Sequence, residues 1–427
     1  MEHNFVYGLM EDIRDQDYAI ASYYIELDCS IDPYEKAKTF AIGQTIGTWV
    51  PVPGITDEMR RNHMGKVVQI FDFPPADLTT QKPDDNIRSY IFQIAYPVIN
   101  FEANFPMMIT TLLGNDASTS SQAKLVDLQL PDSFINELKG PNFGVKGLRK
   151  LCGVEDRPLL LNMIKPCTGF SPETGAKIFY DTALGGVDFI KDDELLGNPS
   201  FCPLEDRVKA YNKASEAAYE VTGKRTIYIP NITDSVDKIF DNATKVIEAG
   251  AKMVMVSFSA VGYSTLHALA KTIKVPIFGH YAGTGPYYEG PKTGMSSPIA
   301  VGKFPRLAGA DGVMINTPYG GYPLERQKYL RTYHELSLPL KEIKPTLTSC
   351  GGGVNPGIVG KFIKDLGTDI MLAPGGAVQG HPMGAAAGVH AMLQAIEASM
   401  HKIPMEEAVK DHKELKAAID LWGYVKS

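Results

Sequence analysis

The feature that most restricts the fold is a repeated alternation of a short apolar run and a helical stretch, which begins near Arg157. Eight such runs follow one another, with starts about 23 to 38 residues apart: 158–165, 187–192, 225–230, 252–258, 275–280, 312–316, 345–349 and 369–373. Helical patterns lie between them, for example at 206–222 and 235–249. Eight strand–helix units over about 260 residues predict a (β/α)8 barrel rather than an open doubly wound sheet.

The first third of the chain has a different pattern. Segments 19–27, 65–73 and 89–96 resemble strands, whereas 33–42 and 105–113 have helical spacing. Strand and helix periods that interleave with polar loops predict an α+β domain with an antiparallel sheet. The whole chain therefore belongs to the α/β class, with the barrel at its C-terminal end.

Composition excludes several classes of function. The net charge is −7 without a run of Lys or Arg, so nucleic acid and anionic membranes gain no electrostatic support as partners. The first residues lack a basic segment followed by an apolar stretch, and no run approaches the ~20 apolar residues of a membrane span. Five scattered cysteines without CxxC spacing argue against a disulfide framework or zinc site. We expect a cytoplasmic protein.

Charged residues gather where the second predicted barrel strand ends, and a barrel places its chemistry at the carboxyl ends of its strands. Lys191 and Asp193 share a face because side chains alternate along a strand, and Glu194 follows as the loop begins. One interpretation is a buried salt bridge. The other is a Mg²⁺ site, in which the Lys191 amine adds carbon dioxide and becomes an anionic oxygen ligand beside the two carboxylates.

Other strand ends carry further candidates. Lys165, at the end of the first strand, could carry a proton if burial and a neighbouring cation lower its pKa; the alternative is a snorkelling or ion-paired lysine. His280, at the end of the fifth strand, could donate to a substrate hydroxyl or be purely structural. Cys167 and Cys350 lie near the same mouth, but the sequence offers no partner histidine that would make either a nucleophile.

Glycine clusters follow the last two strands, where barrels commonly bind phosphate. The first includes Gly352 and Gly353, and the second includes Gly375 and Gly376. Glycine lets backbone N–H groups approach an anion closely, although such clusters also occur in ordinary turns. The sequence thus predicts a phosphorylated small-molecule substrate.

Together these residues resemble the RuBisCO large-subunit family. Segment 185–194 (GGVDFIKDDE) is similar to the family's carbamylated-lysine motif. The Thr48-Trp49 pair, Asn115, the Lys165-Pro166 step and both glycine clusters follow in the family's order, and the resemblance covers nearly the whole chain.

The resemblance implies a fold and an assembly. It implies a ferredoxin-like α+β domain at 1–140, a barrel at 141–427, and a homodimer or an oligomer of dimers with shared active sites. Thr48, Trp49 and Asn115 would come from the partner subunit. It also implies Mg²⁺ held by carbamylated Lys191 with Asp193 and Glu194, and a phosphate site at Thr48, Trp49, Gly352, Gly353, Gly375 and Gly376.

Several positions depart from carboxylating members. Segment 316–321 lacks the lysine that closes over carbon dioxide, and a cation that would stabilise carboxylation is therefore missing. Other replacements are Cys167 for a second lysine, Tyr281 for an arginine, Met314 for a histidine, Gly351 for a serine and Gly43 for a glutamate. In the family the arginine and histidine hold a second phosphate, and the serine lies nearby, so we expect a substrate with one phosphate.

This pattern is similar to the non-carboxylating RuBisCO-like proteins. We expect Mg²⁺-dependent enolisation, nearest to the 2,3-diketo-5-methylthiopentyl-1-phosphate enolases of methionine salvage. Those enzymes carry a lysine base at or beside the position of Asn115, and asparagine cannot abstract a proton, so Lys165 or the Lys191 carbamate would have to act. An isomerase of 5-methylthioribulose 1-phosphate, a decarboxylase of a branched sugar-acid phosphate, a class I aldolase and a non-catalytic sugar-phosphate binding protein are the alternatives.

Overall fold

The computed structural model describes residues 3–47, 52–75, 77 and 86–425. The chain divides into two compact units, one of residues 1–139 with 284–300, the other of residues 140–283 with 301–427. The second stretch of the first unit interrupts the barrel sequence between two strands. In the described part of the chain, no helix combines the length and apolarity needed to cross a membrane.

The first unit is built on a four-stranded antiparallel sheet in the order β2-β3-β1-β4. Its strands are β1 (Tyr18–Asp28), β2 (Lys66–Phe73), β3 (Ile87–Pro97) and β4 (Lys124–Gln129). Its helical elements are α1 (His3–Val6), α2 (Met10–Ile13), α3 (Pro33–Gly43), α4 (Asp57–His63), η1 (Val98–Asn100), α5 (Phe105–Leu112), η2 (Asp116–Ser120), α6 (Asp132–Glu137) and α13 (Gly285–Tyr288).

The succession β1-α3-β2-β3-α5-β4 with this strand order is the ferredoxin-like arrangement, as expected. Helix α3 begins where the Asp32 side chain accepts from the Tyr34 N–H and where Pro33 supplies a helical φ. The helix packs Phe40 edge-on against Tyr23 of β1, with ring centroids 4.8 Å apart. Both side chains are buried, so this contact lies in the core of the unit.

The second unit contains eight parallel strands, and each lies within or overlaps one of the eight predicted runs. They are β5 (Leu159–Met163), β6 (Phe189–Lys191), β7 (Ile227–Ile229), β8 (Val254–Ser257), β9 (Ile277–His280), β10 (Gly312–Ile315), β11 (Leu347–Cys350) and β12 (Ile370–Leu372). The ladder runs β7-β6-β5-β12-β11-β10-β9-β8. A parallel bridge between Asn231 and Met255 then joins its two ends, so the sheet closes into the predicted barrel.

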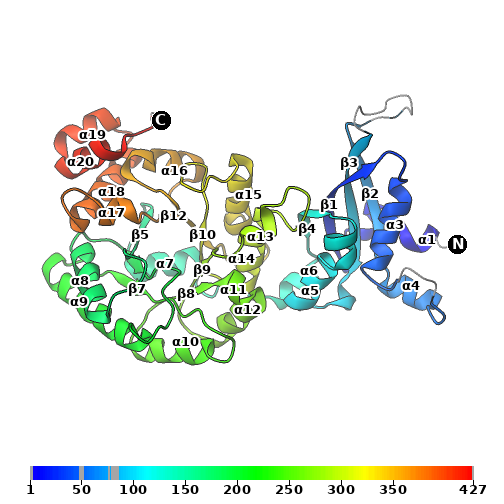
Figure 1. Ribbon diagram of the computed structural model, residues 1–427, viewed down its shortest axis with the longest axis horizontal. Coiled ribbons are helices and arrows are strands. Elements are labelled where there is room, and N and C mark those ends of the chain that lie inside the picture. The colour runs from blue at the N-terminus through cyan, green and yellow to red at the C-terminus, as the bar shows by residue number, and fades with distance from the viewer. Residues whose placement is uncertain (1–2, 48–51, 76, 78–85, 426–427) are drawn as a thin grey trace. The chain divides into compact units, whose positions relative to one another are not determined.

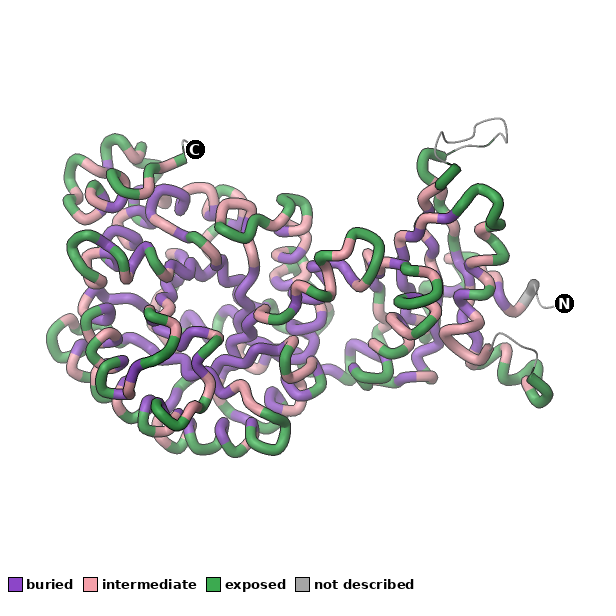
Figure 2. The backbone as a smooth tube through the Cα atoms, viewed as in Figure 1, coloured by how far each residue is buried: buried purple, intermediate pink, exposed green. Residues whose placement is uncertain are grey.

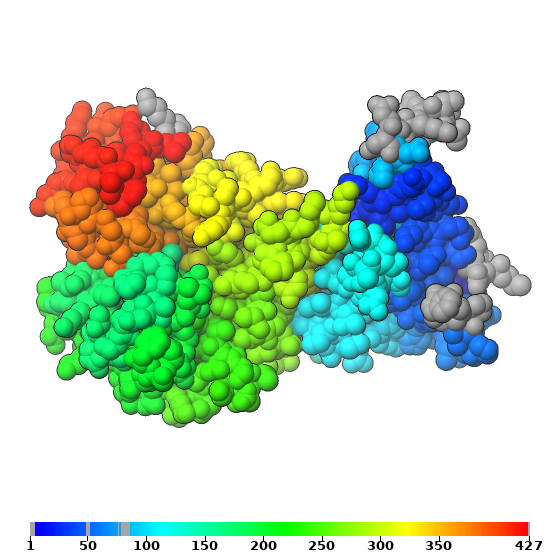
Figure 3. Space-filling view, in the orientation of Figure 1, coloured from blue at the N-terminus to red at the C-terminus, as the bar shows by residue number. Residues whose placement is uncertain are grey.

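Helices surround this ring of strands, and the buried residues concentrate along the strands at its centre (Figures 1 and 2). The helical elements of the unit are α7 (Gly144–Cys152), α8 (Pro172–Ala183), α9 (Leu204–Thr222), α10 (Ile239–Glu248), α11 (Phe258–Val261), α12 (Tyr263–Thr272), η3 (Pro298–Lys303, which begins in the first unit), α14 (Phe304–Ala308), α15 (Arg326–Ser337), η4 (Pro356–Ile358), α16 (Val359–Leu366), α17 (Gly376–Gln379), α18 (Ala385–Met400), α19 (Met405–Asp411) and α20 (Lys413–Trp422). The C-terminal helices, red in Figure 3, pack beside α18.

The register of the strands explains how polar side chains reach the barrel mouth. Leu161, Phe189 and Ile227 pair across three neighbouring strands and form one apolar layer of the interior. Two residues further along, Lys191 pairs with Met163 and Ile229 and therefore points to the same side. Lys191 thus forms part of the last interior layer, at the carboxyl end of the barrel.

Candidate functional site at the carboxyl end of the barrel

Lys191 ends β6 and is completely buried. Its Nζ atom donates to the Asp192 carbonyl oxygen at 2.9 Å and lies 3.8 Å from Oε2 of Glu194. Burial lowers the pKa of Lys191, against the opposing effect of Glu194, Asp193 and Asp192. The amine is therefore more easily neutral than that of an exposed lysine.

Asp193 and Lys165 form an ion pair across the neighbouring strand ends. The Nζ atom of Lys165 lies 2.6 Å from Oδ2 of Asp193, and Oδ1 accepts from the Leu195 N–H at 3.1 Å. Burial opposes the charged form of Lys165, but Asp193 and Cys167 outweigh it and raise the lysine's pKa. The condition set for Lys165 as a proton carrier, a lowered pKa, is therefore not met in this arrangement, and Lys165 takes the alternative, an ion-paired lysine.

His280 ends β9 and faces Glu194. Its Nδ1 atom accepts from the Ala282 N–H at 3.1 Å, which leaves the proton on Nε2, 3.5 Å from Oε2 of Glu194. Burial, with the charges of Lys191 and Lys165, holds the pKa of His280 well below its ordinary value. His280 is thus a neutral donor at the mouth.

The two glycine clusters contact the loop after β10 and the side chain of Lys165, respectively. Gly352 and Gly353 both have positive φ, and a Cβ on Gly320 would lie 1.6 Å from the Gly352 carbonyl oxygen, so the loops after β10 and β11 touch. A Cβ on Gly375 would lie 3.6 Å from Cε of Lys165. Gly376 begins the short helix α17 and is exposed.

A buried amide holds the second glycine turn. Asn162 of β5 donates to the Pro374 carbonyl oxygen at 2.8 Å and accepts from Gln379 at 2.7 Å. Gln379 also donates to the Thr182 hydroxyl at 2.8 Å. This chain of hydrogen bonds links β5, α8 and α17 directly behind Gly375.

The remaining predicted residues lie apart from this group or outside the description. Asn115 is exposed in the first unit, at the start of η2. Thr48 and Trp49 lie outside the described residues. Cys167 lies 3.1 Å from Lys165, whereas Cys350 is fully buried and burial raises its pKa to about 12, which disfavours a nucleophilic thiolate.

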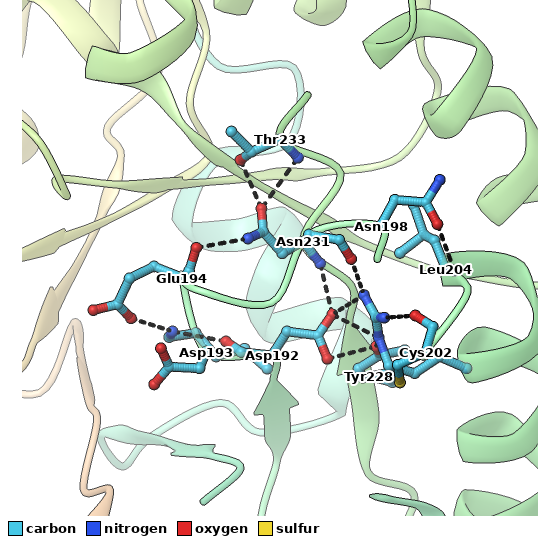
Figure 4. A network of polar contacts seen from close by, with 12 residues as sticks. Asp192, Asp193, Glu194, Asn198, Cys202, Leu204, Tyr228, Asn231 and Thr233 are labelled. Atoms are coloured by element: carbon cyan, nitrogen blue, oxygen red, sulfur yellow. Dashed lines mark hydrogen bonds and ion pairs between the residues drawn. The ribbon is translucent and has the colours of Figure 1, made fainter. Parts of the chain in front are cut away.

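Three residues near the motif were given no role by sequence reasoning. Arg207, Tyr228 and Asn231 all bond to the carboxylate of Asp192, and Figure 4 shows that network beside Asp193 and Glu194. The alternation of side chains along β6 directs Asp192 away from Lys191, and this alone could have indicated that Asp192 has a different role. Nothing in the sequence pattern identifies Arg207 as its partner.

The comparisons with known proteins agree across both units. Residues 144–422 match the model of the ribulose bisphosphate carboxylase large chain, catalytic domain, and residues 10–134 match that of its N-terminal domain. A ribulose bisphosphate carboxylase-like protein of Archaeoglobus fulgidus is 42% identical over 395 residues, covering 92% of this chain and 90% of the relative.

A 2,3-diketo-5-methylthiopentyl-1-phosphate enolase of Geobacillus thermodenitrificans is 35% identical over 408 residues, covering 95% of this chain and 98% of the relative. The crystal structure of a rubisco-like protein from Alicyclobacillus acidocaldarius superposes with a TM-score of 0.88 at 34% identity, covering 95% of this chain and all (100%) of that one. A dimeric archaeal Rubisco from Hyperthermus butylicus gives 0.87 at 29% identity, with coverage of 99% and 100%. The chain belongs to the RuBisCO large-chain family, as a RuBisCO-like protein near the 2,3-diketo-5-methylthiopentyl-1-phosphate enolase branch.

Proposed function

We propose that the protein is a non-carboxylating, Mg²⁺-dependent enzyme that enolises a monophosphorylated ketose-type substrate, with 2,3-diketo-5-methylthiopentyl 1-phosphate as the first candidate. The observation that carries the proposal is the convergence of Lys191, Asp193 and Glu194 at the barrel mouth beside Lys165. The absence of a lysine in segment 316–321 argues against carboxylation.

The residues at the mouth fit a magnesium site only if Lys191 is carbamylated. Without the carbamate, no three His, Cys, Asp or Glu side chains in the described part of the chain are grouped to hold a metal ion. Asp193 and Glu194 supply two carboxylates, and a carbamate on the buried Lys191 amine would supply a third anionic oxygen ligand. When bound, Mg²⁺ would polarise a substrate carbonyl and lower the pKa of the adjacent C–H group.

The protein's own groups would then handle the proton and the phosphate. Lys165 has 36% of its side chain exposed at the mouth, whereas Lys191 is fully buried, so Lys165 is the group better able to reach substrate carbon. As long as it pairs with Asp193 it stays protonated, and it can accept a proton only after that carboxylate is engaged elsewhere. His280 would donate from Nε2 to a substrate oxygen, and the backbone around Gly352, Gly353, Gly375 and Gly376 would bind the phosphate.

We also propose a homodimer with shared active sites, supported by the dimeric and octameric assemblies named for similar Rubisco structures. Thr48, Trp49 and Asn115 would complete the partner's site. Asn115→Ala and Lys191→Ala should each be inactive alone, and unfolded and refolded together they should recover activity through mixed dimers with one intact site. Failure to recover activity would contradict shared sites.

The activity is tested by proton NMR in D₂O with Mg²⁺ and bicarbonate, following C–H exchange in the methylthio diketo phosphate. Exchange with appearance of the enol supports the proposal. Without exchange, the same sample is tested with 5-methylthioribulose 1-phosphate and with a branched sugar-acid phosphate, and turnover there would replace the enolase by an isomerase or a decarboxylase. Incorporation of labelled carbon dioxide into ribulose bisphosphate would overturn the non-carboxylating assignment.

A further inference from the structure

Asp192 stands between two residues of the proposed metal site but points away from it. Lys191 and Asp193 face the barrel mouth, whereas the Asp192 side chain, fully buried, lies on the other side of the strand end. In Figure 4 it extends toward Tyr228 and Cys202, and Glu194 lies on the opposite side. The role of Asp192 must therefore be exerted through the backbone that it shares with its neighbours.

The Asp192 carboxylate is bonded at both oxygens. Its Oδ2 atom accepts from Arg207 (Nε at 3.2 Å and Nη2 at 3.0 Å) and from the Asn231 N–H at 2.9 Å. Its Oδ1 atom accepts from the Tyr228 hydroxyl at 2.7 Å. Arg207 is fully buried and also donates to the carbonyl oxygens of Cys202 and Gly197, each at 2.7 Å. Such a fully bonded buried ion pair has one preferred geometry.

Further hydrogen bonds of the same residues restrain the main chain of the motif. The Asp192 N–H donates to the Ile229 carbonyl oxygen at 3.2 Å, and the Asn231 side-chain amide donates to the Glu194 carbonyl oxygen at 3.1 Å. The Asn231 amide is itself oriented by Thr233, whose hydroxyl donates to its Oδ1 atom at 2.6 Å. The backbone is thus held at residue 192 and again at residue 194, with Asp193 between the two points.

We propose that Asp192, Arg207, Tyr228 and Asn231 form a positioning network, which turns the Lys191, Asp193 and Glu194 side chains toward one metal-binding point. This inference rests on the proposed function, since it assumes that these three residues bind Mg²⁺. Residues that orient metal ligands from behind affect metal affinity without touching the metal. A merely structural network would change the stability of the fold and leave metal affinity unaltered.

The test uses Tyr228→Phe and Arg207→Lys in the full-length protein. The first removes the hydroxyl that donates to Asp192 and accepts from Nε of Arg207 at 3.0 Å, and it keeps the ion pair. The second keeps the charge but removes the two-pronged contact. Tyr219→Phe is the matched control, because Tyr219 lies on α9 with 39% of its surface exposed and contacts Arg225 instead. Thermal unfolding of each variant is measured first, and binding is measured well below its midpoint.

The probes are Mn²⁺, followed by electron paramagnetic resonance, and ¹³C-labelled bicarbonate, followed by the carbamate signal in ¹³C NMR. We expect both variants to bind Mn²⁺ roughly 10-fold more weakly and to show a reduced carbamate signal, with the control unchanged. If folded Tyr228→Phe and Arg207→Lys bind Mn²⁺ as tightly as the wild-type protein, the inference is overturned and the proposed function is not affected. A wild-type protein that shows neither Mn²⁺ binding nor a carbamate would overturn the proposed function, and the inference with it.

Discussion

Lys165 and Asp193 are joined by a 2.6 Å salt bridge that connects the carboxyl ends of two adjacent barrel strands. Asp193 is almost fully buried, and Lys165 is partly exposed. Despite its burial, the pKa of Asp193 is lowered, because Lys165 and the Leu195 N–H stabilise its charged form. The Lys165 ammonium therefore occupies an oxygen of Asp193, a proposed metal ligand, and would compete with a metal ion for that carboxylate.

Lys165→Met is therefore expected to have two opposite effects. Mg²⁺ should bind about twofold to fivefold more tightly, because a partly exposed ion pair is worth about 0.5–1 kcal/mol. Proton exchange in the substrate should fall by roughly 10²–10⁴-fold, because the proposed base is gone. Calorimetric titration with Mg²⁺ and NMR exchange measure the two effects, with exposed Lys177→Met on α8 as the control. Weaker Mg²⁺ binding in Lys165→Met would refute the competition.

Carbamate formation on Lys191 should begin at a lower pH than on an exposed lysine. Burial lowers the pKa of Lys191, and only the neutral amine adds carbon dioxide, so a lower pKa shifts the reactive form to lower pH. The ¹³C carbamate signal is followed from pH 6 to 10 (about the range for an amine of lowered pKa) at constant dissolved carbon dioxide. Lys191→Ala should lose both the signal and metal-dependent turnover. A titration that matches an exposed lysine would contradict this expectation.

Asn162→Leu should weaken phosphate binding and destabilise the barrel. The substitution leaves the buried Pro374 carbonyl oxygen without its donor, which costs about 1–3 kcal/mol of unfolding free energy. It also releases the turn that contains Gly375, so the affinity for inorganic phosphate should fall several-fold. Asn212→Leu is the control, because the Asn212 side chain also donates to a carbonyl oxygen, that of Ala249, but in another part of the unit. Equal phosphate affinities in the two variants would show that the turn does not depend on Asn162.

Arg306→Met should lower the midpoint of thermal unfolding without altering Mn²⁺ binding. Arg306 is buried, and its guanidinium donates to four carbonyl oxygens, those of Glu335, Leu338, Ile343 and Lys344. Removing the donors should cost about 3 kcal/mol or more. Arg225→Met, at an exposed ion pair with Glu216, should change the midpoint little. Similar midpoints for the two variants would contradict this role for Arg306.

The fold could be predicted largely because the barrel strands are buried on both faces. Each strand then appears as a continuous apolar run, and the eight runs start about 23 to 38 residues apart. β4 was not predicted, since its short sequence KLVDLQ alternates only in part. Its neighbour β1 supplies the hydrogen bonds that make it a strand, and that pairing is not local in sequence.

The position of the candidate residues at the strand ends could be predicted from the sequence, but their electrostatics could not. Alternation along β6 correctly directs Lys191 inward, but the pKa of Lys165 depends on a carboxylate 28 residues away in the chain. The same limit applies to Arg207. A fully buried arginine contradicts the usual preference for the surface, and only the packing of α9 against β7, which brings Arg207 beside Asp192, reveals its partner.

The assignment of residues 284–300 to the first unit means that the backbone passes between the units three times, near residues 139, 283 and 300. Within the first unit, this stretch bridges to β4 through Leu125 and Met295, and Lys124 donates to the Gly290 carbonyl oxygen at 2.6 Å. A single proteolytic cut near residue 139 would consequently leave residues 284–300 of the first unit covalently attached to the second. A gene truncated at that point would encode a sheet without its companion segment. The first unit is therefore complete only when the whole chain is synthesised, although each unit has its own core.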